Sequence, residues 1–305
     1  MTTFLVSGAS GFIGGALVPA IAADGHRVLR LGRGADADVR WDPERGEVDA
    51  AALARVAPDA VINLAGEPIA QRWTSGRKRR IRDTRVLGTR ALAAALAQLP
   101  NRPRALVSGS AIGYYGADRG DELLAESSAP GDDFLARVSK DWEDAAAPAA
   151  DAGIRVATLR TGIVCGRGGG ALAKMIPPFQ AGVGGPLGSG RQWMSWISLT
   201  DTVRAIRFIA DDAGASGPFN LVAPEAVRNA DFARALGAAL HRPAIVPAPA
   251  FALVALYGEM ARATILANQR VFPKKIAGAG FEFRHPRLDD ALRAELRRSG
   301  DRAAR

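Results

Sequence analysis

Short apolar runs alternate with longer amphipathic segments through the first two thirds of the chain. The runs at 4–7, 27–31 and 60–64 are rich in Val, Leu, Ile and Phe and have the length of strands. Between them, 16–23 and 77–99 have helical composition and length. Strands that alternate with helices predict a doubly wound α/β sheet, and right-handed crossovers make its strands parallel.

The alternation continues toward residue 165. Apolar runs at 105–108 and 156–159 predict two more strands, and 134–143 has the spacing of an amphipathic helix. Residues 196–209 are typical of a strand end followed by a helix. We interpret 219–222 as a late strand of the same sheet.

The composition changes after residue 165. The glycine-rich stretches 166–170 and 182–193 flank a short helix at 171–175, which we expect Pro177 and Pro178 to end. Two or three helices should follow from Pro224 onward.

These patterns divide the chain into two parts. Residues 1–165, completed by about 196–222, are predicted to form a Rossmann-type dinucleotide-binding domain. Residues 166–195 and 223–305 are predicted to form a smaller, discontinuous and mainly helical lobe.

The longest apolar stretch, 248–256, is too short to cross a bilayer, and we expect it to be a buried helix. Glycines follow the apolar residues 3–6 and no basic region precedes them, so no signal peptide is indicated. We therefore expect a soluble, cytoplasmic protein with no membrane partner.

Composition adds two constraints. The single cysteine, Cys165, excludes an intramolecular disulfide, and the three histidines lack the spacing of metal ligands, so no metal site is expected. The net charge of +9 raises nucleic acid as a partner. We prefer a solvated face, or a basic cleft for an anionic cofactor or substrate. The basic residues concerned are Arg77–Arg80, Arg82, Arg85, Arg293, Arg297, Arg298, Arg302 and Arg305.

A glycine motif follows the first strand, with Gly8, Gly11 and Gly14 at intervals of three. In a dinucleotide site, Gly8 allows the tight turn, Gly11 lets a pyrophosphate approach the backbone, and Gly14 lets the helix pack on the sheet. The first N–H groups of the helix then face the phosphates. The alternative is a purely structural turn, but the strand before the motif and the helix after it favour a cofactor site.

The end of the second strand bears on which dinucleotide binds. An NAD site usually has an acidic residue there, for the ribose 2′-hydroxyl. This strand ends in Leu31-Gly32-Arg33, and Asp36 comes three residues later. Arg33 suits a 2′-phosphate, although it could also be an ordinary surface arginine. The sequence therefore favours NADP(H) over NAD(H).

Taken in order, these residues resemble the extended short-chain dehydrogenase/reductases. The matching segments are Gly8–Gly14, Trp41-Asp42, Asn63–Gly66, Ser108–Ala111, Leu159–Val164 and Trp196–Asp201. Besides Arg33 and Lys140, the resemblance implies that the cofactor is lined by Gly8, Ser10, Gly11, Phe12, Ile13, Gly14, Trp41, Asp42, Leu64, Ala65, Gly66, Ser108, Thr161 and Gly162.

The resemblance narrows to an atypical branch of the NAD-dependent epimerase/dehydratase family that has its own C-terminal domain. The segments 66–73, 81–92, 110–116, 133–143 and 268–286 carry it, so it covers nearly the whole chain. Members are labelled "epimerase family protein" or, in places, a cell division inhibitor. The branch implies a fold and a cofactor but leaves the reaction unassigned.

The catalytic positions depart from the wider family. That family uses Tyr-x-x-x-Lys on one helix face, where the tyrosine exchanges a proton with the substrate. Here Lys140 matches the lysine, which holds the nicotinamide ribose, but the tyrosine position is Ala136. Ser110 falls at the family's catalytic hydroxyl, where it would polarise a substrate oxygen.

Two other residues could complete the site. Tyr114 follows Ser110 in the chain and could supply the missing proton, although loop packing is the preferred interpretation for the tyrosines here. Arg85 stands where the family often has asparagine. It could bind an anion, or it could be one more residue of the basic helix face.

Two functions remain open. One is an NADP(H)-dependent oxidoreductase or epimerase-like enzyme acting on an unidentified small molecule, which would carry an anionic group if Arg85 turns inward. The other is a catalytically silent NADP(H)-dependent sensor or binding module, favoured by Ala136. The family label alone suggests a sugar epimerase. The sequence does not decide between monomer and homodimer.

Overall fold

The structure, a computed structural model, describes residues 1–296. The basic residues Arg297, Arg298, Arg302 and Arg305, and the end of the predicted 223–305 lobe segment, lie outside the described residues.

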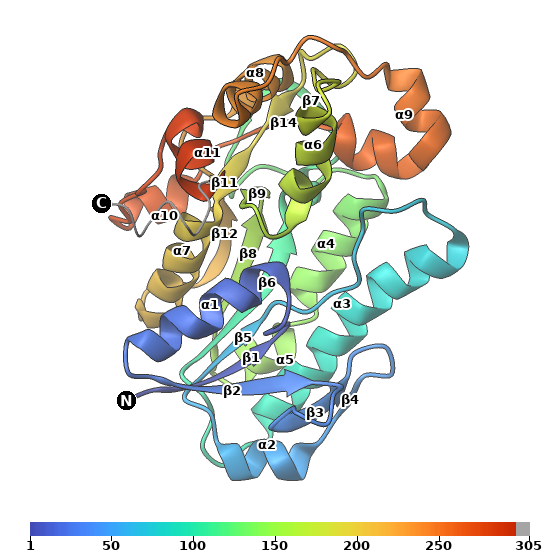
Figure 1. The fold of residues 1–305 in the computed structure, drawn as a ribbon. Helices are drawn as coiled ribbons and strands as arrows, with labels where there is room; N and C mark the ends of the chain where they lie inside the picture. The colour runs from blue at the N-terminus through green and yellow to red at the C-terminus, as the bar shows by residue number, and fades with distance from the viewer. Residues whose placement is uncertain (297–305) are drawn as a thin grey trace.

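An eight-stranded sheet forms the centre of the molecule (Figure 1). Its strand order is β12-β8-β6-β5-β1-β2-β3-β4, and every neighbouring pair is parallel except β3 and β4. The chain runs outward from β1 to β4 and then returns to β5 on the other side of β1, so the strand order reverses between β1 and β5. Ligands of such sheets bind at this reversal, beyond the carboxyl ends of the strands. The strands are β1 (Thr3–Ser7), β2 (Arg27–Gly32), β3 (Val39–Asp42), β4 (Glu47–Val48), β5 (Ala60–Asn63), β6 (Ala105–Ala111), β8 (Arg155–Thr161) and β12 (Gly217–Leu221).

Helices cover both faces of the sheet (Figure 1). Helices α1 and α7 pack side by side over one apolar cluster that includes Leu17, Ile62 and Ile206. Helix α3, with α5 beside it, encloses a second cluster on the other face, around Leu92 and Leu106. The predicted doubly wound fold is confirmed. These helices are α1 (Phe12–Ala23), α2 (Ala50–Val56), α3 (Ser75–Ala97), α4 (Phe134–Asp144), α5 (Ala147–Asp151) and α7 (Leu199–Asp211).

Most of the remaining elements gather beyond the carboxyl ends of the strands, at the top of Figure 1, whereas α10 packs against the edge strand β12. A third apolar cluster joins α6, α8 and α11 and contains Trp196, Phe232 and the thiol of Cys165, all fully buried. Burial raises the pKa of that thiol above its ordinary value. The elements are η1 (Ile112–Tyr115), β7 (Asp118–Leu124), β9 (Ile163–Cys165), α6 (Gly170–Gln180), β10 (Trp193–Met194), β11 (Trp196–Ser198), β13 (Val227–Arg228), α8 (Asn229–Leu240), α9 (Ala250–Tyr257), η2 (Ala261–Ile265), β14 (Asn268–Val271), α10 (Lys274–Gly278) and α11 (Leu288–Leu296).

Two expectations about this region are wrong. Helix α6 continues through Pro177 and Pro178, because proline keeps a helical φ and removes only two backbone donors near the helix end. The predicted buried helix at 248–256 is instead α9, none of whose residues is buried. Phe251 is 78% exposed, because no residue of α9 joins the apolar clusters in the described part of the chain; Arg72 donates a hydrogen bond to the carbonyl of Ala255 in this helix (2.8 Å).

Within residues 1–296, no helix combines the length and the apolar character needed to span a membrane. The predicted two-lobe division, with its boundaries at 165, 195 and 222, stays a prediction.

A buried carboxylate fastens the C-terminal part to α7. Asp201 is fully buried and accepts hydrogen bonds from the backbone N–H groups of Arg284 and His285, both at 2.8 Å. It also pairs with Arg204 (2.8 Å) and accepts a hydrogen bond from the Ser198 hydroxyl.

We predict that Asp201→Ala lowers the free energy of unfolding by about 3 kcal/mol, because buried donors lose their acceptor. Urea denaturation measures the change. Asp231→Ala, which removes a half-exposed carboxylate paired to Arg234, is the control and should leave stability nearly unchanged. Equal losses in the two variants would contradict the fastening role.

Candidate functional site

The turn after β1 is built for close backbone approach. Gly8 has a φ of +66°, which favours glycine. A Cβ on Gly14 would lie 2.1 Å from the Gly8 carbonyl oxygen, so no side chain fits there. A Cβ on Gly8 would lie 3.0–3.1 Å from the backbone of Leu64 and Ala65, which follow β5. Strands β1 and β5 therefore end in one tight cradle.

Helix α1 begins in this cradle. Gly11 is its N-cap, and no side chain among the described residues caps it, so its first N–H groups remain for a ligand. Ser10 and Gly11 are exposed, whereas Phe12 and Ile13 are half-buried. The Phe12 ring packs against the glycine-rich loop 166–170, which crosses the start of the helix.

Buried hydrogen bonds hold the segment after β5. The Ser7 hydroxyl donates to Asn63 (2.6 Å) and accepts the backbone N–H groups of Leu64 and Ala65. The Asn63 amide donates to the hydroxyls of Thr89 (2.9 Å) and Ser108 (3.4 Å). Ser108 thus lies within the network that shapes the cradle.

The predicted cofactor residues near β2 and β3 differ in exposure: Arg33 and Asp42 lie at the surface or close to it, and Trp41 is buried. Arg33 is exposed and lies 3.7 Å from Glu44, which follows β3. Asp42 caps the turn by accepting the N–H of Glu44 (3.0 Å). Trp41 is buried in the sheet core, where its ring packs beside Gly88 of α3.

The predicted catalytic serine is tied to a buried ion pair. The Ser110 hydroxyl donates to Glu143 of α4 (2.7 Å), and both Glu143 oxygens accept hydrogen bonds from Arg160 of β8 at 2.8 Å. Arg160 is only 3% exposed. Burial disfavours its charge, but the contacts with Glu143 outweigh that cost and raise the pKa of Arg160.

The two tyrosines differ in burial. Tyr115 is fully buried and donates its hydroxyl proton to Asn220 (2.7 Å), as expected for packing, and burial raises the pKa of its hydroxyl. Tyr114 is half-buried, with its ring 3.4 Å from the Arg160 guanidinium carbon. Tyr114 and Ser110 thus lie around one Arg160–Glu143 pair.

The helix with the missing tyrosine is α4. Asp133 caps it by accepting the N–H of Ala136 (2.9 Å), and Ala136 is fully buried. Lys140 is exposed and pairs with Asp144 at 2.6 Å, a hydrogen bond that raises the pKa of Lys140.

Arg85 points inward from α3. Its guanidinium donates to the carbonyls of Glu67 (3.0 Å) and Ile81 (3.1 Å) and lies 5.1 Å from the Trp142 ring. Burial lowers the pKa of Arg85 to about 10, although the Glu67 carboxylate opposes this change. A Cβ on Gly66 would lie 2.9 Å from the guanidinium, so Arg85 braces the segment that follows β5.

The residues after β8 are also closely packed. The Thr161 hydroxyl donates to the Leu159 carbonyl (3.2 Å). A Cβ on Gly162 would lie 2.6 Å from the Ser195 carbonyl oxygen, which explains the glycine.

Comparison with known proteins identifies the family. Residues 4–221 match the NAD dependent epimerase/dehydratase family, and residues 248–295 match a domain of unknown function, DUF1731. The chain is 44% identical over 299 residues to an epimerase family protein of Mycobacterium bovis, covering 97% of this chain and 98% of the relative. The human epimerase family protein SDR39U1 is 34% identical, with 95% and 98% covered. The chain therefore belongs to the NAD dependent epimerase/dehydratase family, and the resemblance to its atypical branch is confirmed.

Comparison with solved structures also supports this family assignment. The crystal structure of human SDR39U1 (isoform 2) with NADPH has a TM-score of 0.86 at 34% identity and covers 96% of this chain and 98% of that one. A nucleoside-diphosphate sugar epimerase from Corynebacterium glutamicum has a TM-score of 0.80 at 35% identity, covering 97% of this chain and 58% of that one. MoeE5 in complex with UDP-glucose and NAD, at 22% identity and a TM-score of 0.77, shows the fold alone.

Sequence reasoning missed Glu143, Arg160 and Glu44, and it named Arg80 only as one member of the basic run 77–80. The first two stand at ordinary charged positions in the sequence, 17 residues apart, and only the packing of α4 on the sheet pairs them. The one available signal was a charged residue inside an apolar strand, since Arg160 interrupts the run of β8.

We predict that Glu143→Ala lowers the free energy of unfolding by about 3 kcal/mol, because it leaves the buried Arg160 without its counter-ion. Glu143→Gln should lose less, since the amide oxygen still accepts hydrogen bonds. The control is Glu122→Ala, which removes the exposed partner of Arg119. A smaller loss for Glu143→Ala than for Glu122→Ala in urea denaturation would refute the prediction.

Proposed function

We propose that this protein binds NADP(H) and acts as an oxidoreductase or epimerase-like enzyme on a small molecule. The single observation that carries the proposal is the backbone cradle of Gly8, Gly11 and Gly14 at the strand-order reversal, where no side chain fits at Gly14. The relative solved with NADPH supports the choice of cofactor. When bound, the nicotinamide would supply a hydride donor or acceptor.

The residues that surround the cradle fit such a ligand. The uncapped N-terminus of α1 offers N–H groups to a diphosphate. We propose that the cofactor contacts Gly8, Ser10, Gly11, Phe12, Ile13, Gly14, Arg33, Asp42, Leu64, Ala65, Gly66, Lys140, Thr161 and Gly162. Trp41 and Ser108 are buried, so we propose that they shape the site from beneath.

On the substrate side, Ser110 and Tyr114 would face the reacting group, and Glu143 would orient the Ser110 hydroxyl. Lys140 would leave Asp144 to hold the nicotinamide ribose. Arg85 already uses its guanidinium on two carbonyls, so we propose that it positions the cofactor-lining segment rather than clamping a substrate anion. The position of Arg85 therefore gives no reason to expect an anionic group on the substrate.

A second function, a binding module or sensor without turnover, has one specific observation in its favour. The only proton of the Ser110 hydroxyl is directed to Glu143, and Ala136 has none to give. Unless Tyr114 supplies the proton, such a site binds its cofactor but reduces no carbonyl.

We predict that NADPH binds at least about tenfold more tightly than NADH, because charge-assisted hydrogen bonds to a 2′-phosphate contribute about 1.5–3 kcal/mol. Arg33→Ala should reduce this preference by weakening NADPH alone. Titration of nicotinamide fluorescence measures both affinities. Arg30→Ala, which removes an exposed arginine of β2 paired to Asp36, is the matched control. Equal binding of the two cofactors by the wild-type protein would overturn the NADP(H) assignment.

Turnover separates the two functions. In a panel of carbonyl compounds with NADPH, we expect oxidation of NADPH with at least one compound, and a decrease of about 100-fold in kcat for Ser110→Ala and for Tyr114→Phe. NADPH affinity should stay unchanged in both variants, which distinguishes lost chemistry from lost cofactor. Tight NADPH binding with no oxidation across the panel would favour the sensor.

A further inference from the structure

Two arginines from distant parts of the chain approach one carboxylate oxygen. Arg33 follows β2, Arg80 belongs to α3, and Glu44 follows β3. The Glu44 Oε1 atom lies 3.7 Å from Arg33 Nη1 and 3.5 Å from Arg80 Nη2. A single oxygen thus lies between two guanidinium groups that are 47 positions apart in the sequence.

The place of this trio in the fold connects it with the glycine cradle. Strands β1, β2 and β3 are adjacent and parallel, with Ser7 paired to Leu31 and Leu31 paired to Val39. The loops after these strands therefore emerge at the same edge of the sheet. Gly8 begins one of these loops, and Arg33 and Glu44 lie in the other two. A nucleotide with its diphosphate in the cradle would extend its adenosine toward this side of the sheet.

Glu44 forms no close hydrogen bond with either arginine. Its distances of 3.5 and 3.7 Å exceed the 2.7–2.9 Å of a strong charge-assisted hydrogen bond. The side chains of Arg33, Arg80 and Glu44 are 69%, 50% and 34% exposed, so a ligand can reach them. With Glu67 and Arg77, which extend this group, three arginines face two carboxylates. The surplus positive charge suits a phosphate, which has more oxygens to share between two guanidinium groups.

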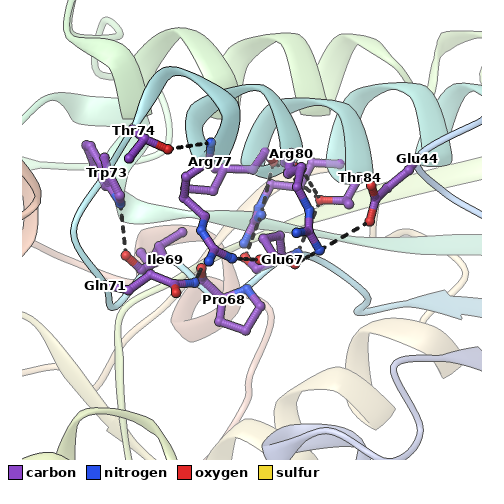
Figure 2. A network of polar contacts seen from close by, with 12 residues as sticks. Glu44, Glu67, Pro68, Ile69, Gln71, Trp73, Thr74, Arg77, Arg80 and Thr84 are labelled. Carbon is purple, nitrogen blue, oxygen red and sulfur yellow. Dashed lines mark hydrogen bonds and ion pairs between the residues drawn. The ribbon is translucent and has the colours of Figure 1, made fainter.

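Arg80 also has a second carboxylate partner, Glu67, on the side away from Glu44. Figure 2 shows its side chain between Glu44 and Glu67. Glu67 is only 12% exposed and hydrogen-bonds to Arg77, and its second oxygen lies 3.5 Å from Arg80. This arrangement limits the positions of the Arg80 guanidinium and leaves Glu44, rather than Glu67, as the displaceable partner.

We propose that Arg80 is a second specificity-determining residue for NADP(H), which clamps the 2′-phosphate together with Arg33, and that Glu44 is the internal anion that the phosphate displaces. This inference rests on the proposed function, because it assumes the cofactor bound in the cradle. It selects Arg80 from the basic run 77–80 and gives Glu44 a role that the sequence alone did not indicate.

The test compares the binding of NADPH, NADH and adenosine 2′,5′-bisphosphate to the full chain by isothermal titration calorimetry. Arg80→Ala should weaken NADPH and the bisphosphate about tenfold or more and leave NADH within twofold. Arg79→Ala, which removes an exposed neighbour on the same helix, is the charge-matched control and should change each affinity less than twofold. Glu44→Gln should strengthen NADPH and the bisphosphate about threefold, the size of a lost surface ion pair, without affecting NADH.

The outcomes separate this inference from the proposed function. If Arg33→Ala weakens NADPH but Arg80→Ala behaves like Arg79→Ala, the clamp is wrong and the NADP(H) assignment stands. Weaker NADPH binding in Glu44→Gln would also overturn the clamp, because it would make Glu44 a supporting residue instead of a displaced one. If the wild-type protein binds no NADPH, the proposed function itself fails.

Discussion

The candidate cofactor site depends on the absence of a side chain at Gly14. At Gly14 the helix α1 approaches the Gly8 carbonyl so closely that a Cβ would lie 2.1 Å from its oxygen. That same carbonyl accepts the N–H of Gly11 at 2.9 Å, so the turn and the helix are fixed by one group. Because β1 lies at the centre of the sheet, this contact sets where α1 begins relative to the strands on both sides. Close approach of backbone atoms makes this half of the site, and the buried Ser7 hydroxyl and Asn63 amide hold the segment that faces it.

The other half is made by side chains and by buried charge. Arg160 and Glu143 join β8 to α4, and the hydroxyls of Ser110, Tyr115 and the ring of Tyr114 are arranged around them. Charges removed from water require partners that hold their positions, so this cluster gives Ser110 one defined orientation. The same commitment takes the serine proton away from any incoming oxygen. The half around α1 therefore presents uncapped backbone N–H groups, while in the other half the Ser110 hydroxyl proton is already donated to Glu143.

The sequence allowed much of the fold to be predicted, because apolar runs and glycines report local geometry directly. The cradle at Gly8, Gly11 and Gly14 follows from the glycine spacing together with the strand before it and the helix after it, and the missing hydroxyl at Ala136 follows from a resemblance. The ion pair of Arg160 and Glu143 could not be predicted, since it depends on how a helix packs across a sheet. Helix α9 was misjudged for a related reason: its apolar composition says nothing about whether a neighbour covers it.

The buried Cys165 gives this protein an internal reporter. It is the one thiol in the sequence, it is fully buried among α6, α8 and α11, and its raised pKa keeps it protonated. An alkylating reagent can therefore modify the native chain only when the packing of these helices opens. The rate of labelling would report on how often this part of the molecule opens, and a single mass increment would mark each molecule that has opened and reacted, without an introduced probe.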